Sequence, residues 1–225
     1  MTIHYSNIPN EAQASSVTSG LSKPGPYEAV FKRGFDIFLV LVALPIIFPI
    51  IAVLALLVAR DGDGAFYCQK RVGRGGKTYR MWKLRTMVAN ADQQLMVYLA
   101  KNPAANAEWT TTQKLKNDPR ITPLGLVLRK CSMDELPQLW NVLIGDMSLV
   151  GPRPMLPEQQ DLYPGLAYYD QRPGITGIWQ VSQRNESTFA DRARFDTDYC
   201  ANISFKSDLK LLLATAQVVV RGTGY

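Results

Sequence analysis

The chain has 225 residues, which is enough for one domain with appendages. Its formal net charge is +6, with 25 Lys and Arg against 19 Asp and Glu, and this excess suits anionic lipid, a phosphorylated substrate or nucleic acid. No nucleic-acid-binding motif accompanies the charge, and the cysteines Cys68, Cys131 and Cys200 form no Cys-x-x-Cys pair, which argues against a nucleic-acid partner, a disulfide framework and a cysteine zinc site.

Residues 1–26 are rich in Ser, Asn, Gln, Pro and Gly and contain few large apolar side chains, so we expect a disordered tail. They lack the basic start and apolar core of a cleaved signal peptide. The only histidine, His4, lies in this tail. Chemistry in the folded part must therefore rely on carboxylates, lysines, tyrosines, thiols or a metal rather than on an imidazole base.

An apolar segment without any charged residue follows at residues 37–59. A straight helix of that length would reach about 34 Å and could cross a bilayer. Pro45 and Pro49 lie near its middle, where each removes a backbone donor and favours a bend. The segment is flanked on both sides by basic residues, namely Lys32, Arg33, Arg60, Lys70 and Arg71.

Basic flanks mark the cytoplasmic side of a membrane, so both ends of this segment are expected there. That pattern favours a helix that enters the membrane and returns. The alternative is an ordinary spanning helix with a tolerated proline kink, and the residues alone give the two readings equal weight.

Two β-prone runs, residues 66–73 and 77–87, surround Arg74-Gly75-Gly76 and predict a hairpin. Lys and Arg alternate with aromatic residues along the hairpin. Such a run is usually a solvated face, but it comes directly after the membrane segment, which favours contact with anionic lipid headgroups.

Four further segments are expected to be helical: residues 90–100, 124–130, 191–199 and 208–220. Residues 102–115 are interpreted as a polar connection, and residues 171–181 as a turn followed by a strand. Asp196 and Asp198 could hold a metal or form a solvated helix face, and we favour the face. The last helix could lie against protein core or in the membrane interface.

The stretch from Arg129 to Pro154 organises the rest of the chain. Ser132 and Glu135 have the spacing of a capping box, and apolar residues follow at helical steps, namely Leu136, Leu139, Trp140 and Leu143. Asp134 and Glu135 would then lie in a first turn, where the helix dipole favours negative charge and also a phosphate. These acids could accept a phosphoryl group or merely begin a helix, and the second reading is the commoner one.

Two arginines flank the acids in sequence. Arg129 ends a predicted helix and could clamp a phosphate or simply interact with the helix dipole. Arg153 lies between Pro152 and Pro154 in a stiff loop, where its planar fork could bind a phosphate or a uracil carbonyl, or could be exposed on a rigid turn.

Residues 132–154, SMDELPQLWNVLIGDMSLVGPRP, resemble the core of the monotopic bacterial phosphoglycosyl transferases. The resemblance is long and specific, and it extends from about Phe31 to the C-terminus. It is greatest to the exopolysaccharide-initiating hexose-1-phosphate transferases that consist of little more than this domain. Enzymes of this family move a sugar phosphate from a nucleotide-activated sugar to a polyprenyl phosphate.

The resemblance implies an α/β-associated, mostly helical fold with a short β-hairpin and amphipathic interfacial helices. It favours a re-entrant membrane helix at residues 27–60, broken at Pro45 and Pro49, and a cytoplasmic catalytic domain at residues 61–225. The expected location is the bacterial inner membrane, with the active site on its cytoplasmic face. Copies of the chain could also form a homo-oligomer.

The resemblance also assigns roles to residues. Asp134 would be the nucleophile that forms an aspartyl-phosphosugar, and Glu135 would hold Mg²⁺. The residues expected to bind phosphate and nucleotide are Arg129, Pro152, Arg153, Pro154, Lys83 and Arg85. The expected partners are UDP-hexose, with galactose or glucose as the sugar, undecaprenyl phosphate and anionic lipid.

A competing interpretation is a non-catalytic membrane scaffold that binds anionic lipid or a nucleotide and recruits a polysaccharide export complex. Such a scaffold would explain the basic surface and the apolar segment, but it gives no reason for an Asp-Glu pair beside Arg129.

Overall fold

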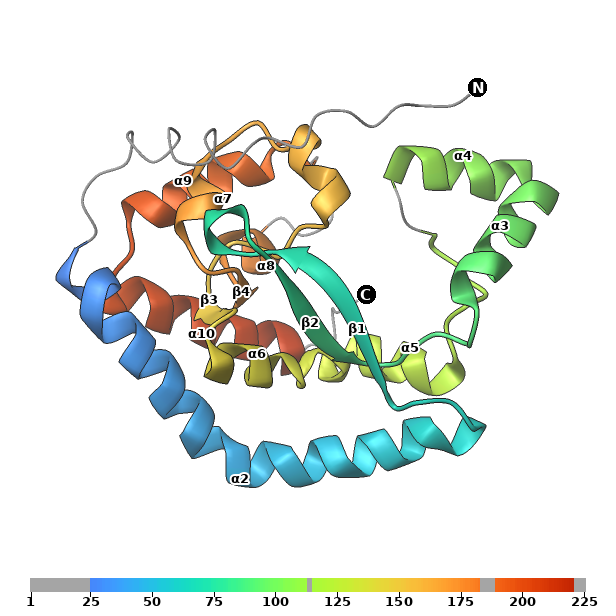
Figure 1. Ribbon diagram of the computed structural model, residues 1–225, viewed down its shortest axis with the longest axis horizontal. Coiled ribbons are helices and arrows are strands. Elements are labelled where there is room, and N and C mark those ends of the chain that lie inside the picture. The colour runs from blue at the N-terminus through green and yellow to red at the C-terminus, as the bar shows by residue number, and fades with distance from the viewer. Residues whose placement is uncertain (1–24, 113–114, 183–188, 221–225) are drawn as a thin grey trace. The chain divides into compact units, whose positions relative to one another are not determined.

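The computed structural model describes residues 25–112, 115–182 and 189–220. Most of these residues are helical, as predicted, and the strands are short (Figure 1). The described chain divides into two compact units. The first unit holds the described residues up to Ala43 with Gln69–Met81 and Gln138–Gln217. The second holds Leu44–Cys68, Trp82–Pro137 and the described residues from Val218, at the end of helix α10 (Phe205–Val220). Almost all of the predicted tail lies outside the described residues.

A long apolar helix begins the described chain. A π-helical turn, Tyr27–Phe31, leads into α2, Lys32–Val58, which continues through both Pro45 and Pro49. This helix is long and apolar enough to cross a membrane, and only 6% of its most apolar window is buried, unlike the core helix of a soluble protein. The expected membrane-candidate helix is therefore present, whereas its re-entry remains a prediction.

The hairpin is confirmed. β1, Phe66–Val72, and β2, Thr78–Leu84, pair side by side, and the turn between them contains Arg74–Gly76 (Figure 1). Gly75 and Gly76 have φ angles of 66° and 76°. Glycine adopts this left-handed conformation without steric cost, so the Gly-Gly pair accounts for the tight connection.

The first unit contains a short parallel ladder. β3, Ser148–Val150, pairs with β4, Gly174–Thr176, with Ser148 opposite Gly174. A Cβ atom on Gly174 would lie 2.1 Å from the amide nitrogen of Gly151, so the two backbones approach too closely for a side chain.

Helices make up most of the rest of the first unit. They are α6 (Gln138–Ile144), a 3₁₀ helix (Pro157–Leu162), α7 (Ala167–Asp170), α8 (Ile178–Ser182), α9 (Arg192–Ala201) and α10 (Phe205–Val220). A core cluster contains Val72, Met155, Tyr163 and Tyr168. The Tyr168 hydroxyl donates to the Val72 carbonyl and accepts from the Met155 amide, so its polar end is satisfied inside this cluster.

The expectation of a turn followed by a strand at residues 171–181 is half right. Strand β4 lies at Gly174–Thr176, but residues 178–181 form helix α8. β4 ends at Thr176, and no described strand pairs with the residues that follow it. The following backbone groups therefore bond within a helix instead of within a sheet.

The second unit contains α3 (Ala91–Lys101), α4 (Pro103–Thr112) and α5 (Pro123–Lys130). α3 and α5 agree with the predicted helices, and the Thr122 hydroxyl caps α5 by accepting a hydrogen bond from the Gly125 amide at 2.9 Å. The prediction of a polar connection at residues 102–115 is wrong, because α4 lies there. Proline suits a first helical position and alanine favours helix, which explains α4.

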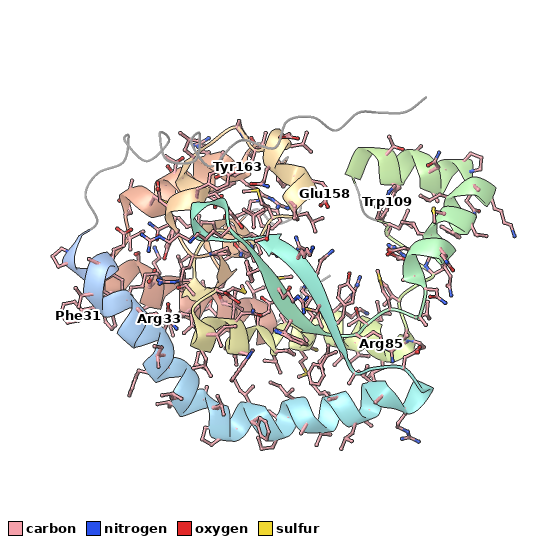
Figure 2. The ribbon with its side chains drawn as sticks, in the orientation of Figure 1. Phe31, Arg33, Arg85, Trp109, Glu158 and Tyr163 are labelled. Atoms are coloured by element: carbon pink, nitrogen blue, oxygen red, sulfur yellow. The ribbon has the colours of Figure 1, made fainter. Side chains whose placement is uncertain are left out.

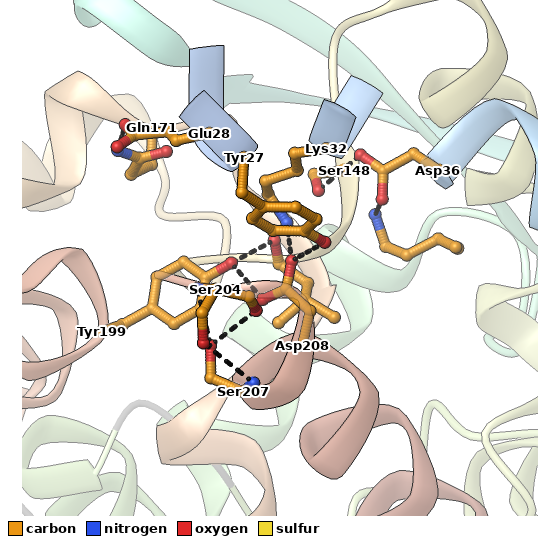
Figure 3. Close-up of polar contacts among 12 residues, drawn as sticks. Tyr27, Glu28, Lys32, Asp36, Ser148, Gln171, Tyr199, Ser204, Ser207 and Asp208 are labelled. Atoms are coloured by element: carbon orange, nitrogen blue, oxygen red, sulfur yellow. Dashed lines mark hydrogen bonds and ion pairs between the residues drawn. The ribbon is translucent and has the colours of Figure 1, made fainter. Parts of the chain in front are cut away.

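The start of α2 is held in the first unit by a buried polar network, which Figure 3 shows. The Lys32 ammonium lies 2.6 Å from the Asp208 carboxylate, and the hydroxyls of Tyr27 and Tyr199 donate to the same carboxylate at 2.9 and 2.8 Å. The Asp36 carboxylate accepts from the Ser148 hydroxyl at 2.7 Å. Helix α2 is therefore tied to α9, α10 and β3.

Candidate active site

The central acids lie on a single 3₁₀ turn, Met133–Glu135, and not at the start of a longer helix. Ser132 has a φ of 54° and its side chain makes no capping hydrogen bond, so the predicted capping box does not form. The regular helix α6 begins only at Gln138. Ser132 follows directly on Cys131, the C-cap of α5, and its left-handed backbone ends that helix.

The apolar residues at helical spacing are buried to different extents. Trp140 is 58% exposed, whereas Gln138, Asn141 and Val142 are buried. The Asn141 amide donates to the Arg80 carbonyl at 2.7 Å, a long-range bond that a count of apolar spacings cannot anticipate.

Asp134 and Glu135 share one cation in the second unit. The Lys83 ammonium, on β2, lies 2.8 Å from the Glu135 carboxylate and 3.7 Å from the Asp134 carboxylate. Asp134 is only 7% exposed. The structure therefore brings together three of the predicted site residues.

Burial raises the pKa of the Asp134 carboxyl above its usual range. The Lys83 ammonium opposes this rise, the Glu135 carboxylate adds to it, and the Arg129 guanidinium opposes it. The two cations therefore favour the anionic form that a nucleophilic carboxylate needs.

Arg129 lies at the end of α5, where its Nε donates to the Thr86 hydroxyl at 2.9 Å. Burial lowers the pKa of this guanidinium, and the Asp134 and Asp118 carboxylates counteract the effect. An arginine that is partly desolvated and close to Asp134 is well placed to bind a phosphate.

Arg85 has a different environment. It follows the end of β2 (Figure 2), and its guanidinium donates to the carbonyls of Gly64 at 2.6 Å, Val58 at 3.1 Å and Met87 at 3.3 Å. These bonds fix the backbone after α2. The predicted phosphate contact of Arg85 remains a prediction.

The described residues contain no cluster of three or more His, Cys, Asp or Glu side chains that could hold a metal. Mg²⁺ often binds to only one or two carboxylates and completes its shell with water and substrate phosphates. The carboxylate oxygens of Asp134 and Glu135 fit such a cation, so Glu135 remains the predicted ligand.

Arg153 lies in the first unit, next to residues that the sequence did not single out. Its guanidinium carbon is 5.3 Å from the centre of the Trp179 ring, and that of Arg192 is 4.4 Å from the same centre. The Arg71 guanidinium donates to the Pro154 carbonyl at 3.1 Å and so holds the Gly151-Pro152-Arg153-Pro154 loop. Nothing in the sequence placed Arg71 against this loop, because no local pattern links β1 to it.

The prediction of a solvated face for Asp196 and Asp198 is half right. Asp198 is exposed, but Asp196 is buried and accepts a hydrogen bond from the Tyr163 hydroxyl at 2.8 Å. Burial raises the pKa of Asp196 to about 6. Its carboxylate packs inside the first unit, and the metal role considered for it remains untested.

Comparison with known proteins places the chain in a family. The family model described as bacterial sugar transferase matches residues 27–222. The chain is 43% identical over 202 residues to the exopolysaccharide production protein ExoY of Sinorhizobium fredii. The aligned residues cover 88% of this chain and 89% of that protein.

Two further relatives have other names. Identity is 47% to an undecaprenyl-phosphate galactose phosphotransferase of Salmonella typhimurium, over 86% of this chain but 41% of that longer protein. It is 39% to a putative undecaprenyl-phosphate N-acetylgalactosaminyl 1-phosphate transferase of Bacillus subtilis, over 88% of this chain and 96% of that protein. With a family match over nearly the whole described chain, this protein belongs to the bacterial sugar transferases.

Proposed function

We propose that this protein is a phosphoglycosyl transferase that moves hexose-1-phosphate from a UDP-hexose to undecaprenyl phosphate and releases UMP. This would be the first membrane step of exopolysaccharide biosynthesis. The family match and the names of the relatives support the transfer of a sugar phosphate to a lipid carrier. Galactose or glucose is the proposed sugar, and the Salmonella relative is named for galactose.

The observation that carries the proposal is the environment of Asp134. This carboxylate is buried, lies 3.7 Å from the Lys83 ammonium and is close enough to Arg129 for the guanidinium to affect its pKa. Such surroundings suit a group that must remain anionic and accept a phosphoryl group.

In the first step, an Asp134 carboxylate oxygen attacks the β-phosphorus of UDP-hexose. The bond from that phosphorus to the oxygen bridging the two phosphates breaks, and UMP leaves with the bridging oxygen and the electron pair. The product is an aspartyl-phosphosugar. A carboxylate is already ionised at neutral pH, so the nucleophile needs no general base. This agrees with the described residues, which contain no histidine that could act as one.

In the second step, a phosphate oxygen of undecaprenyl phosphate attacks the same phosphorus. The bond to Asp134 breaks, the carboxylate is regenerated, and the sugar leaves on undecaprenyl diphosphate. Lys83 and Arg129 would offset the negative charge of the phosphates in both steps. Glu135 would hold Mg²⁺, which supplies further charge neutralisation at the phosphate oxygens.

Helix α2 would anchor the protein in the membrane that contains its lipid substrate. We propose that α2 enters the inner membrane and returns, so that the active site lies on the cytoplasmic face. The basic hairpin would then lie against anionic headgroups.

The test of the proposal is a covalent adduct. The wild-type protein, incubated with UDP-hexose radiolabelled in the sugar but without undecaprenyl phosphate, should become labelled, and the acceptor lipid should remove the label. Asp134→Asn should take up no label and lose at least about 10³-fold in turnover, because the nucleophile is gone.

Asp92→Asn, at an exposed acid of α3, is the matched control and should keep full labelling. Glu135→Gln should be nearly inactive and should need more Mg²⁺. Label that persists on Asp134→Asn would exclude the proposed nucleophile, and absence of UMP release by the wild-type protein with every UDP-sugar would exclude the function.

A further inference from the structure

We propose that Gln180, on α8, hydrogen-bonds the uracil base of the nucleotide donor, and that Arg192 joins Arg153 in binding its phosphates. The inference rests on the proposed function, because that function supplies a uridine nucleotide. It assigns a base-recognising residue to the first unit.

Gln180 is a buried amide whose polar atoms lack partners. The residue is 8% exposed, and within the described part of the chain neither Nε2 nor Oε1 makes a hydrogen bond. The Nε of Arg192 is also buried without a partner in that part. Native proteins rarely leave such groups unpaired, so a polar ligand is expected to meet them.

The amide borders the loop that carries Arg153. A Cβ atom built on Gly177 would lie 2.9 Å from the Gln180 Oε1 and 2.2 Å from the carbonyl oxygen of Gly151. Gly151 begins the Gly151-Pro152-Arg153-Pro154 loop. All of these residues belong to the first unit, so the subsite is complete within one compact part of the chain.

The same place concentrates positive charge. Arg153 and Arg192 both pack on the Trp179 ring, and neither forms an ion pair with a carboxylate of the described residues. Burial, with smaller contributions from Arg153 and Arg71, lowers the pKa of Arg192 to about 10. A guanidinium held over a ring can still donate N–H hydrogen bonds to an anion, so a bound phosphate would relieve the repulsion between the arginines.

A uridine nucleotide matches both features. The edge of uracil places an N–H donor between two carbonyl acceptors, and a carboxamide can donate to one carbonyl while accepting from the N–H. The phosphates of the nucleotide would meet the arginines. A sugar phosphate without a base would satisfy only the arginines, and this difference provides the test.

The experiment compares UMP with ribose 5-phosphate as ligands of the purified full-length protein in detergent. Gln180→Leu keeps the size of the side chain but removes both hydrogen bonds. We expect this variant to bind UMP about 10-fold more weakly, because it loses roughly two neutral hydrogen bonds to the base. Its affinity for ribose 5-phosphate, which has no base, should be unchanged. The exposed Gln94→Leu is the matched control and should bind both ligands like the wild type.

Thermal unfolding without ligand excludes a folding defect. Removing an unpaired buried amide should leave the midpoint of Gln180→Leu equal to or above that of the wild type, whereas a structural hydrogen bond would lower it. Unchanged UMP affinity, equal weakening of both ligands, or a lowered midpoint would each overturn the inference. UMP release is assayed separately, so a wild-type protein that binds UMP but turns over no UDP-sugar would refute the proposed function and not the role of Gln180.

Discussion

Lys83 interacts with both central acids, and its positive charge favours the anionic form of Asp134. Its ammonium lies 2.8 Å from Glu135 and 3.7 Å from Asp134, and it is the main group that opposes the rise of the Asp134 pKa caused by burial. The sequence suggested an anion-binding lysine, but its contact with the acids depends on a β2 residue meeting a turn 52 positions later.

This arrangement predicts a pH effect. The proposed nucleophile is the Asp134 carboxylate, so adduct formation should rise with pH as this group loses its proton. Lys83→Met removes a cation that lowers the Asp134 pKa, so the acid limb of the pH profile should move to higher pH. Single-turnover labelling from UDP-hexose between pH 4 and about 8 measures the limb.

Lys77→Met, at an exposed lysine beside the hairpin turn, is the control and should leave the profile in place. An acid limb at the same pH in Lys83→Met and in the wild type would show that Lys83 does not control Asp134.

At the scale of elements, the turn Met133–Glu135 shows where local patterns fail. Ser-x-x-Glu followed by apolar residues is typical of a helix start. Here α5 ends at Lys130, and the Ser132 amide still donates to the Arg129 carbonyl at 3.1 Å. Ser132 therefore ends one helix, and the acids lie on a separate short turn. The capping-box pattern therefore predicted the wrong element for these acids, because it does not register the end of the preceding helix.

The attachment of α2 to α10 can be tested by a double-mutant cycle. Asp208 is 1% exposed and accepts hydrogen bonds from Lys32, Tyr27 and Tyr199. Asp208→Leu leaves the buried Lys32 ammonium unpaired and should destabilise the protein by about 3–5 kcal/mol, because a buried charge without a partner is costly. Thermal or denaturant unfolding in detergent measures the loss.

The double variant Lys32→Met/Asp208→Leu should recover most of that stability, since an apolar pair replaces the ion pair. The exposed Lys206→Met is the single-site control and should have little effect. Additive losses in the double variant would mean that the pair does not couple α2 to α10.

For the whole molecule, short-range signals predicted short-range structure. The Gly-Gly turn predicted the hairpin, and the helices expected at residues 90–100, 124–130 and 191–199 correspond to α3, α5 and α9. What could not be predicted depends on residues far apart in sequence. Lys32 and Asp208 are 176 positions apart, and the Arg153 loop meets Trp179 and Arg192 only because β3 and β4 pair in parallel. The amide of Gln180 gave no signal until its burial was known.

The two ends of α2 provide an argument about membrane topology. The first unit holds the N-terminal end, through Lys32 and Asp36. The second unit holds the C-terminal end, where Arg85 binds the Val58 carbonyl. Basic residues flank the apolar segment of α2 on both sides, and positive charge favours the cytoplasmic side of a membrane. We therefore expect both ends of α2 on that face.

Cysteine labelling tests this topology. After Cys68, Cys131 and Cys200 are replaced by serine, a cysteine is introduced at Asn10 or at Ala105. A membrane-impermeant maleimide should label neither position in intact spheroplasts and both after permeabilisation, because both ends are expected in the cytoplasm. Replacing Pro45 and Pro49 together with leucine restores two backbone donors and favours a straight, crossing helix, so one position should become accessible from outside. Labelling of either position in intact spheroplasts of the parent protein would instead show that α2 spans the membrane.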